Sequence, residues 1–176
     1  MTLTVAAIAG SLRADSLNRK LLRAATARLP EGTVVNELSI DLPLFNTDID
    51  KPDSVKAFSS AIGAADGVLI ATPEYNYGIP GPLKNAIDWA SRPAYQSVFA
   101  RKKVGILGAS MGASGTIRAQ AHLKNVLMGM VAIPFCHPEY ALGAAHTKFD
   151  GETLADTRSA ELLEGYIEGF VGFLQG

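Results

Sequence analysis

Two patterns of apolar and polar positions alternate along the chain. Short runs of apolar or β-branched residues that stop at glycine or proline predict buried strands. Longer segments with an apolar residue at every third or fourth position predict amphipathic helices. The predicted strands are residues 3–9, 33–40, 67–72, 103–109 and 131–136, and the predicted helices are residues 16–29, 53–65, 82–91, 115–130 and 153–174.

Strands that alternate with helices predict a parallel sheet with helices on both faces. We therefore expect a doubly wound α/β fold with five strands. No linker, repeat or change of composition interrupts the 176 residues, so a single domain is expected. The segment 41–53 is rich in proline and aspartate and is expected to be a solvated loop, although its apolar residues Leu44 and Phe45 must pack against something.

Composition and charge exclude several classes of protein. Charged residues make up 19% and apolar residues 48% of the chain, as in an ordinary globular protein. Sixteen basic and 17 acidic residues leave a net charge of −1, which argues against binding to nucleic acid or an anionic membrane. No signal peptide or membrane-spanning run is expected. The only cysteine, Cys136, cannot form an internal disulfide, so we expect a cytoplasmic protein.

The loop after the first predicted strand, residues 10–18, concentrates hydrogen-bond donors. Ligands of open parallel sheets bind beyond the carboxyl ends of the strands, and a helix N-terminus favours an anion there. The hydroxyls of Ser11 and Ser16 and the amide of Asn18 can donate to phosphate oxygens, and Arg13 supplies positive charge. The alternative for Ser16 alone is that it caps the helix. Neither a G-x-G-x-x-G loop nor a Walker A loop is present, so a monophosphate fits best.

Two further loops are unusual. Residues 72–82 contain three prolines and two glycines, which make a stiff turn with Tyr75, Asn76 and Tyr77 at its tip. Rigid aromatic residues and backbone amides suit a planar ring with polar edges. Residues 108–115 are small and glycine-rich, which permits close approach of the backbone to a ligand. Together with the first loop, they indicate a ring-bearing phosphate ligand.

Other chemistries have little support. Cys136 and His137 are adjacent in a predicted strand and would point to opposite faces, so a buried, inert thiol is expected. Residues 108–112 have the letters of a nucleophile elbow, but His146 precedes Asp150, the reverse of the order a hydrolase of that type needs. The three histidines, His122, His137 and His146, show no metal-ligand spacing, and no metal is expected.

Two motifs resemble the NAD(P)H-dependent FMN reductase family, whose members include quinone, azo-dye and chromate reductases. They are AGSLRADSLN at residues 9–18 and PEYNYGIPGPLKNAIDW at residues 73–89, and the order of elements matches over nearly the whole chain. The resemblance implies a flavodoxin-like fold with strand order 2-1-3-4-5. It also implies bound FMN, NAD(P)H as co-substrate, and a homodimer or homotetramer.

The resemblance also assigns site residues by position. The FMN phosphate would be held by Ser11, Arg13, Ser16, Leu17 and Asn18. The isoalloxazine ring would be contacted from one side by Pro73, Glu74, Tyr75 and Asn76, and its other edge would be lined by Ser110, Met111 and Gly112. Because the flavin carries the redox chemistry, no catalytic side chain is expected. Family members often have glycine at the positions of Ala109 and Ala113, which leaves the shape of the third loop open.

The expected activity is hydride transfer from NAD(P)H through FMN to quinones, free flavin, azo dyes or chromate. The alternative is a flavodoxin-type electron carrier, or an FMN-binding module, without NAD(P)H oxidation of its own. Carriers dock on basic partners through acidic patches, and a net charge of −1 argues against this. Contact between copies of the chain is expected around the apolar residues Trp89, Tyr95, Val98 and Phe99, with polar contacts from residues 118–120.

Overall fold

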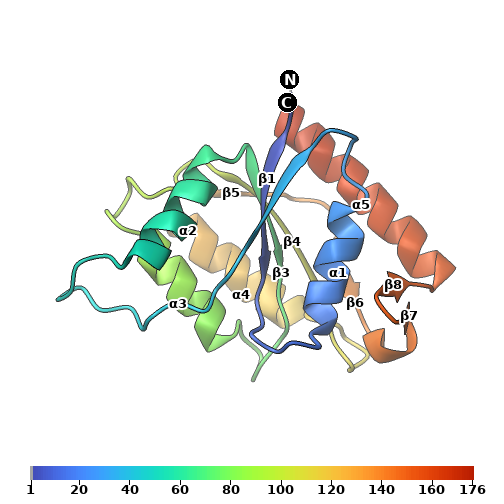
Figure 1. Cartoon of the computed structure of the whole chain (residues 1–176). Coiled ribbons are helices and arrows are strands. Elements are labelled where there is room, and N and C mark those ends of the chain that lie inside the picture. The colour runs from blue at the N-terminus through green and yellow to red at the C-terminus, as the bar shows by residue number, and fades with distance from the viewer. Residues whose placement is uncertain (1) are drawn as a thin grey trace.

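The computed structural model describes residues 2–176, which form a central sheet between two layers of helices (Figure 1). The strands are Thr4–Ala9 (β1), Val34–Leu38 (β2), Gly67–Ala71 (β3), Lys103–Ala109 (β4), Ile133–Pro134 (β5), Tyr140–Leu142 (β6), Phe149–Asp150 (β7) and Thr153–Leu154 (β8). The helices are Leu17–Thr26 (α1), Asp53–Ala64 (α2), Gly81–Ala90 (α3), Ile117–Met128 (α4) and Thr157–Gln175 (α5), with a short 3₁₀ turn at Ala145–Thr147. None of these helices is long and apolar enough to span a bilayer.

The main sheet is parallel and has the strand order β2-β1-β3-β4-β5, which confirms the predicted order and the flavodoxin-like fold. Strands β1 and β3 are buried along almost their whole length because helices cover both of their faces. Helices α1 and α5 cover one face, where Leu21, Leu163 and Phe170 pack together (Figure 1). Helices α2, α3 and α4 cover the other face, where Phe58 and Leu123 lie in the core.

The fifth predicted strand, residues 131–136, is wrong in extent. Only Ile133–Pro134 pairs there, beside Lys103 and Val104 of β4. The chain then leaves the sheet and returns as β6, which pairs with the same edge of β4 at Leu107–Ala109. The backbone bonds to β4 and to the residue before it come from Ile133 N and Phe135 N, on either side of Pro134, and Pro138 in the segment that follows has no N–H to donate to a ladder.

The last helix begins later than predicted. Residues 153 and 154 belong to the antiparallel β7–β8 hairpin, in which Asp150 pairs with Thr153. Gly151 has a φ of +58°, which suits a tight two-residue connection. Helix α5 then starts at Thr157, where the side chain of Asp156 accepts a hydrogen bond from Ser159 N.

The segment 41–53 runs over the surface, and only half of its predicted packing is present. The ring of Phe45 packs edge-on against Trp89, with ring centroids 5.0 Å apart. Leu44, by contrast, is 84% exposed, so its predicted packing partner is not found among residues 2–176. Trp89 and Phe99 are buried in the chain's own core and are not available for contact between copies, whereas Tyr95 is exposed.

Candidate functional site

Three loops meet at the carboxyl edge of the sheet because hydrogen bonds join the ends of their strands. Gly10 N donates to Ala71 O at 2.8 Å, and Thr72 N donates to Leu107 O at 2.9 Å. A Cβ on Gly108 would collide with the Thr116 hydroxyl and with Thr72 O, so this close approach requires glycine. The loops after β1, β3 and β4 are thereby held side by side.

The loops enclose a cavity of about 210 Å³. It is lined by Ser11, Arg13, Ser16, Leu17, Asn18, Pro73, Glu74, Tyr75, Ala109, Ser110 and Met111. The structure therefore brings together most of the residues that the sequence predicts for the site. Asn76 and Gly112 are outside the lining, and Ala109 is a lining residue that the sequence analysis did not assign to the site. The sequence feature that could have identified Ala109 is its position at the end of a buried strand, directly before Ser110.

The end of the cavity formed by the first loop is rich in donors. Ser16 is the N-cap of α1 and its Oγ accepts a hydrogen bond from Arg19 N at 3.4 Å, as the capping alternative predicted. Ser11 Oγ accepts from Arg13 N at 3.3 Å. Both serines are buried, and each hydroxyl keeps its own hydrogen to donate. Leu17 begins the helix, where backbone N–H groups have no partner within the helix. This end of the cavity therefore favours an anion.

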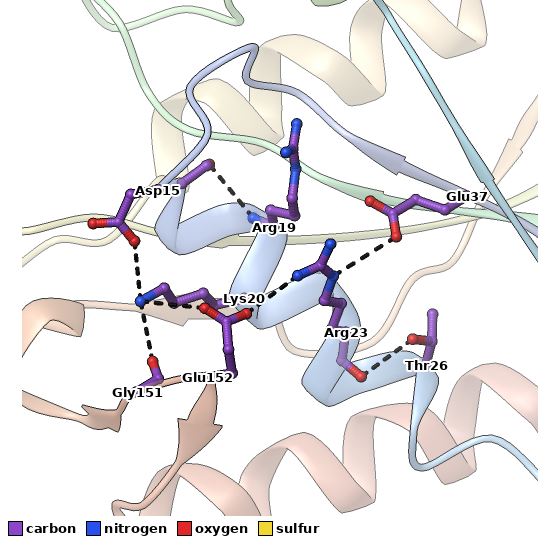
Figure 2. A network of polar contacts seen from close by, with 9 residues as sticks. Asp15, Arg19, Lys20, Arg23, Thr26, Glu37, Gly151 and Glu152 are labelled. Atoms are coloured by element: carbon purple, nitrogen blue, oxygen red, sulfur yellow. Dashed lines mark hydrogen bonds and ion pairs between the residues drawn. The ribbon is translucent and has the colours of Figure 1, made fainter.

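Asp15, the acidic residue of the first loop, takes part in a network of ion pairs and hydrogen bonds outside the cavity (Figure 2). The carboxylate of Asp15 pairs with Lys20 at 3.0 Å, and the Lys20 ammonium also donates to Gly151 O in the β7–β8 hairpin. Glu152 of that hairpin pairs with both Lys20 and Arg23. The hydrogen bond from Lys20 to Asp15 raises the pKa of Lys20. The charge of Asp15 is thus balanced outside the cavity, and the loop is tied to the hairpin.

Asn18 forms two buried hydrogen bonds across the cavity in addition to its predicted place in the lining. Its Nδ2 donates to Ala109 O at 2.9 Å, and its Oδ1 accepts from Ala109 N at 2.8 Å. These two buried bonds connect the first turn of α1 to the last residue of β4. Asn18 therefore links two walls of the cavity, and its contribution to phosphate binding stays a prediction.

The loop after β3 contains a tight turn. Tyr75 and Gly78 exchange backbone hydrogen bonds of 3.0 Å in both directions. The two central residues, Asn76 and Tyr77, have φ values of +51° and +66°, as a type I′ turn requires. The turn carries Asn76 to an exposed tip, which explains why this residue does not line the cavity. Tyr75 lies at the cavity mouth, half exposed.

The carboxylate of Glu74 forms an ion pair with Arg118 of α4, with Oε1 and Nη1 2.8 Å apart. Burial acts to raise the pKa of Glu74, but the hydrogen bonds it accepts from Arg118 and Ala119 outweigh burial and leave the pKa below its ordinary value. Glu74 is therefore an ionised, paired group and does not offer a proton to a ligand at neutral pH.

The third loop is held by the segment that follows it in the sheet. Ser110 N donates to Leu142 O at 3.0 Å, and Ala145 N donates to Ser110 O at 2.9 Å. Ser110 Oγ accepts from Gly112 N at 3.1 Å, which directs the Gly112 backbone toward its own loop. Ser110 and Met111 line the cavity, and Met111 is largely exposed at its mouth.

The remaining candidate residues lie outside the cavity. Cys136 is exposed, so the prediction of a buried thiol is wrong, and the interruption of the fifth strand is the reason. His122 lies on the exposed surface of α4, where its Nδ1 accepts from Ile79 N at 3.4 Å. Within residues 2–176, no group of three His, Cys, Asp or Glu side chains is placed to hold a metal ion.

Comparison with known proteins adds a family to this geometry. A family model described as NADPH-dependent FMN reductase matches residues 3–147. The chain belongs to this family. It is 42% identical over 169 residues to an NAD(P)H-dependent FMN reductase of Pseudomonas aeruginosa, covering 93% of this chain and 91% of the relative. It is 39% identical over 181 residues to a quinone reductase of Escherichia coli, covering 98% and 96%.

A solved structure of the same family is similar throughout. FerB, a flavoenzyme NAD(P)H:(acceptor) oxidoreductase from Paracoccus denitrificans, superposes with a TM-score of 0.92 at 36% identity. The match covers 99% of this chain and 98% of FerB. The family resemblance seen in the two sequence motifs is thereby confirmed over the whole fold.

Proposed function

We propose that this protein is an NAD(P)H-dependent FMN oxidoreductase that passes two electrons from reduced nicotinamide to quinones or other small acceptors, such as free flavin, azo dyes and chromate. The observation that carries the proposal is the single cavity in which a donor-rich helix N-terminus meets a rigid aromatic turn. The names of the relatives, which are FMN and quinone reductases, support the same reaction.

The donor set fits the phosphate of FMN. Ser11 and Ser16 can donate their hydroxyl hydrogens, Arg13 adds a positive charge, and Leu17 contributes the N–H groups at the start of α1. The first turn of α1 contains no Asp or Glu that would repel an anion. Charge-assisted hydrogen bonds contribute about 1.5–3 kcal/mol each, so three of them approach the roughly 8 kcal/mol of a micromolar complex.

The remainder of the cavity fits a ring that is only partly enclosed. Its volume of about 210 Å³ is below the roughly 300–1,000 Å³ of an ordinary ligand pocket. We infer that Pro73 and Tyr75 contact one side of the isoalloxazine ring and that Ser110 and Met111 border its other edge. The ring would then lie at an open mouth, accessible to planar co-substrates.

Bound FMN would supply the hydride acceptance and donation of the reaction. The chain's own residues bind the phosphate, orient the ring and leave one side of it accessible. Among the titratable residues that line the cavity, Glu74 is paired with Arg118 and Arg13 carries a permanent charge. Neither is suited to transfer protons at neutral pH, so we assign no catalytic acid or base.

The assembly and location are also proposals. We infer that the chain acts as one domain, forms a homodimer or homotetramer as the family resemblance implies, and works in the cytoplasm, where a lone cysteine stays reduced. Exposed Tyr77, Tyr95 and Leu44 offer apolar surface for contact between copies. Light scattering that shows a monomer at micromolar concentration would overturn the oligomer.

Steady-state kinetics with the purified protein test the function. We expect yellow protein, or colourless protein that takes up added FMN, and oxidation of NADH or NADPH that depends on a quinone such as benzoquinone. A flavodoxin-type carrier would bind FMN but oxidise almost no nicotinamide without a separate reductase. Protein that does not bind FMN would contradict the proposal. Anaerobic titration with each nicotinamide then decides which one is preferred.

A further inference from the structure

The carboxylate of Glu74 caps a helix that belongs to another part of the chain. Its Oε2 accepts hydrogen bonds from Arg118 N at 3.0 Å and from Ala119 N at 3.1 Å. Its Oε1 accepts a third hydrogen bond, from Arg118 Nη1 at 2.8 Å. The Glu74 side chain is only 10% exposed, whereas that of Arg118 is 53% exposed.

Helix α4 needs this external cap. The first N–H groups of a helix have no partner within it and are usually satisfied by the side chain of the N-cap residue. Thr116 is the N-cap of α4, but its side chain forms no capping hydrogen bond to the described residues. Glu74 supplies the missing acceptors, and its negative charge also complements the positive end of the helix dipole.

Two more contacts join the same loop and the same helix. The guanidinium of Arg118 lies 4.3 Å from the centroid of the Tyr77 ring, a favourable cation–π distance. One turn further along α4, His122 Nδ1 accepts the hydrogen bond from Ile79 N. The loop after β3 is thus fastened to the first two turns of α4 on both sides of its tight turn.

We propose that Glu74 is a positioning residue that sets the separation of the two cavity walls, rather than a contact of the flavin ring. The loop that carries Glu74 forms one wall, and the loop that leads into α4 carries Ser110 and Met111 in the opposite wall. A carboxylate that joins the loop after β3 to the start of α4 therefore fixes the width of the space between these two walls. The effect on FMN rests on the proposed function, whereas the cap itself does not.

Three variants separate the parts of this contact. Glu74→Ala removes the cap and the ion pair, whereas Glu74→Gln keeps an oxygen that can accept the backbone hydrogen bonds and loses only the charge. Asp156→Ala is the matched control for Glu74→Ala, because Asp156 is also a carboxylate that caps a helix, α5, and does not line the cavity. Arg118→Ala, alone and combined with each Glu74 variant, measures the coupling between the two side chains.

FMN affinity, the visible spectrum of bound FMN and the melting temperature of the FMN-free chain are measured for each variant. We expect Glu74→Ala to weaken FMN binding about tenfold, the equivalent of losing one helix cap. We also expect it to shift the flavin absorption bands and to raise KM for the quinone more than it changes kcat. Glu74→Gln should restore most of the affinity, and Asp156→Ala should lower the melting temperature only.

The outcomes distinguish the proposals. If Glu74→Ala lowers the melting temperature but leaves the affinity and spectrum of FMN unchanged, Glu74 is a helix cap only and the positioning function is wrong. Should Glu74→Ala fail to fold, equal FMN affinity and spectra for Glu74→Gln, Arg118→Ala and the wild type would also overturn it. If the wild type does not bind FMN, the proposed function fails, whereas an unchanged melting temperature of the FMN-free Glu74→Ala chain would independently refute the cap.

Discussion

The two halves of the cavity are built differently. At the end formed by the β1–α1 loop, Ser11, Ser16 and Arg13 keep hydrogen-bond donors free for a ligand. At the end formed by the loop after β3, Glu74 and Tyr77 are already bonded to α4. A charged phosphate makes strong, directed bonds and needs unpaired donors. A planar ring makes weaker contacts, so the surface that receives it must be shaped before it arrives.

A negative charge placed at the end of the cavity formed by the β1–α1 loop should have the largest effect on FMN affinity. Ser11→Asp places a carboxylate in the buried part of the cavity, where two like charges about 4 Å apart repel by roughly 4 kcal/mol at an effective dielectric constant of about 20. We expect FMN affinity, measured by quenching of flavin fluorescence, to fall at least about 100-fold. Leu12→Asp, on the neighbouring exposed residue outside the cavity, is the control. Equal affinities for the two variants would place the phosphate elsewhere.

Removing the positive charge of Arg13 at the same end of the cavity should weaken FMN binding less. Arg13→Ala deletes a charge-assisted hydrogen bond of about 1.5–3 kcal/mol, which corresponds to roughly 10- to 100-fold weaker FMN binding. Because the Arg13 side chain is exposed, the melting temperature of the FMN-free chain should stay the same. Arg158→Ala, on the exposed surface of α5, is the matched control. Unchanged FMN affinity in Arg13→Ala would remove Arg13 from the site.

Acid should destabilise the end of the cavity formed by the loop after β3, because protonation of Glu74 removes its charge. Its pKa lies below the ordinary value of 4.5, so its stabilising contribution is complete above that value and is lost as the pH falls through the lowered pKa. Glu139 and Asp156 also have lowered pKa values and contribute to acid unfolding. The difference in unfolding free energy between wild type and Glu74→Gln isolates the Glu74 part. We expect this difference to shrink as the pH is lowered from 6 toward 3, and a constant difference would contradict the assignment.

The smallest effect on FMN affinity is expected for a residue that lies outside both halves of the cavity. Cys136→Ser changes an exposed side chain that does not line the cavity, and surface changes of this kind are usually within about 0.5 kcal/mol, or roughly twofold in affinity. FMN affinity and quinone turnover should therefore match the wild type. The wild-type thiol should react rapidly with a chromogenic disulfide in the folded state. A slow reaction that needs denaturant would restore the buried thiol that the sequence predicted.

The sequence predicted the elements that follow a regular pattern. The apolar run of β3 and the proline in the first turn of α3 are local signals, and both elements form within a residue or two of their predicted bounds. The interrupted β5–β6 edge was missed because an apolar run alone does not show where the chain leaves the sheet and returns to the same strand. The hairpin before α5 was missed because its strands have only two residues each.

For the site, the sequence predicted which residues gather but not what each one does. Asn18 bonds to Ala109, which is 91 positions away, and Glu74 bonds to Arg118, which is 44 positions away. A polar residue in a motif looks like a ligand group until its distant partner is known. The hydroxyls of Ser11 and Ser16, whose contacts are local, kept their predicted place in the cavity.

The interrupted sheet edge gives the chain a single chemical handle. Cys136 follows β5, which pairs with the first residues of β4, whereas the cavity lies beyond the other end of that strand. Since the sequence contains no second cysteine, a maleimide linker would attach every molecule at the same point. With an electrode or a dye attached at Cys136, the cavity would stay accessible to dissolved reagents.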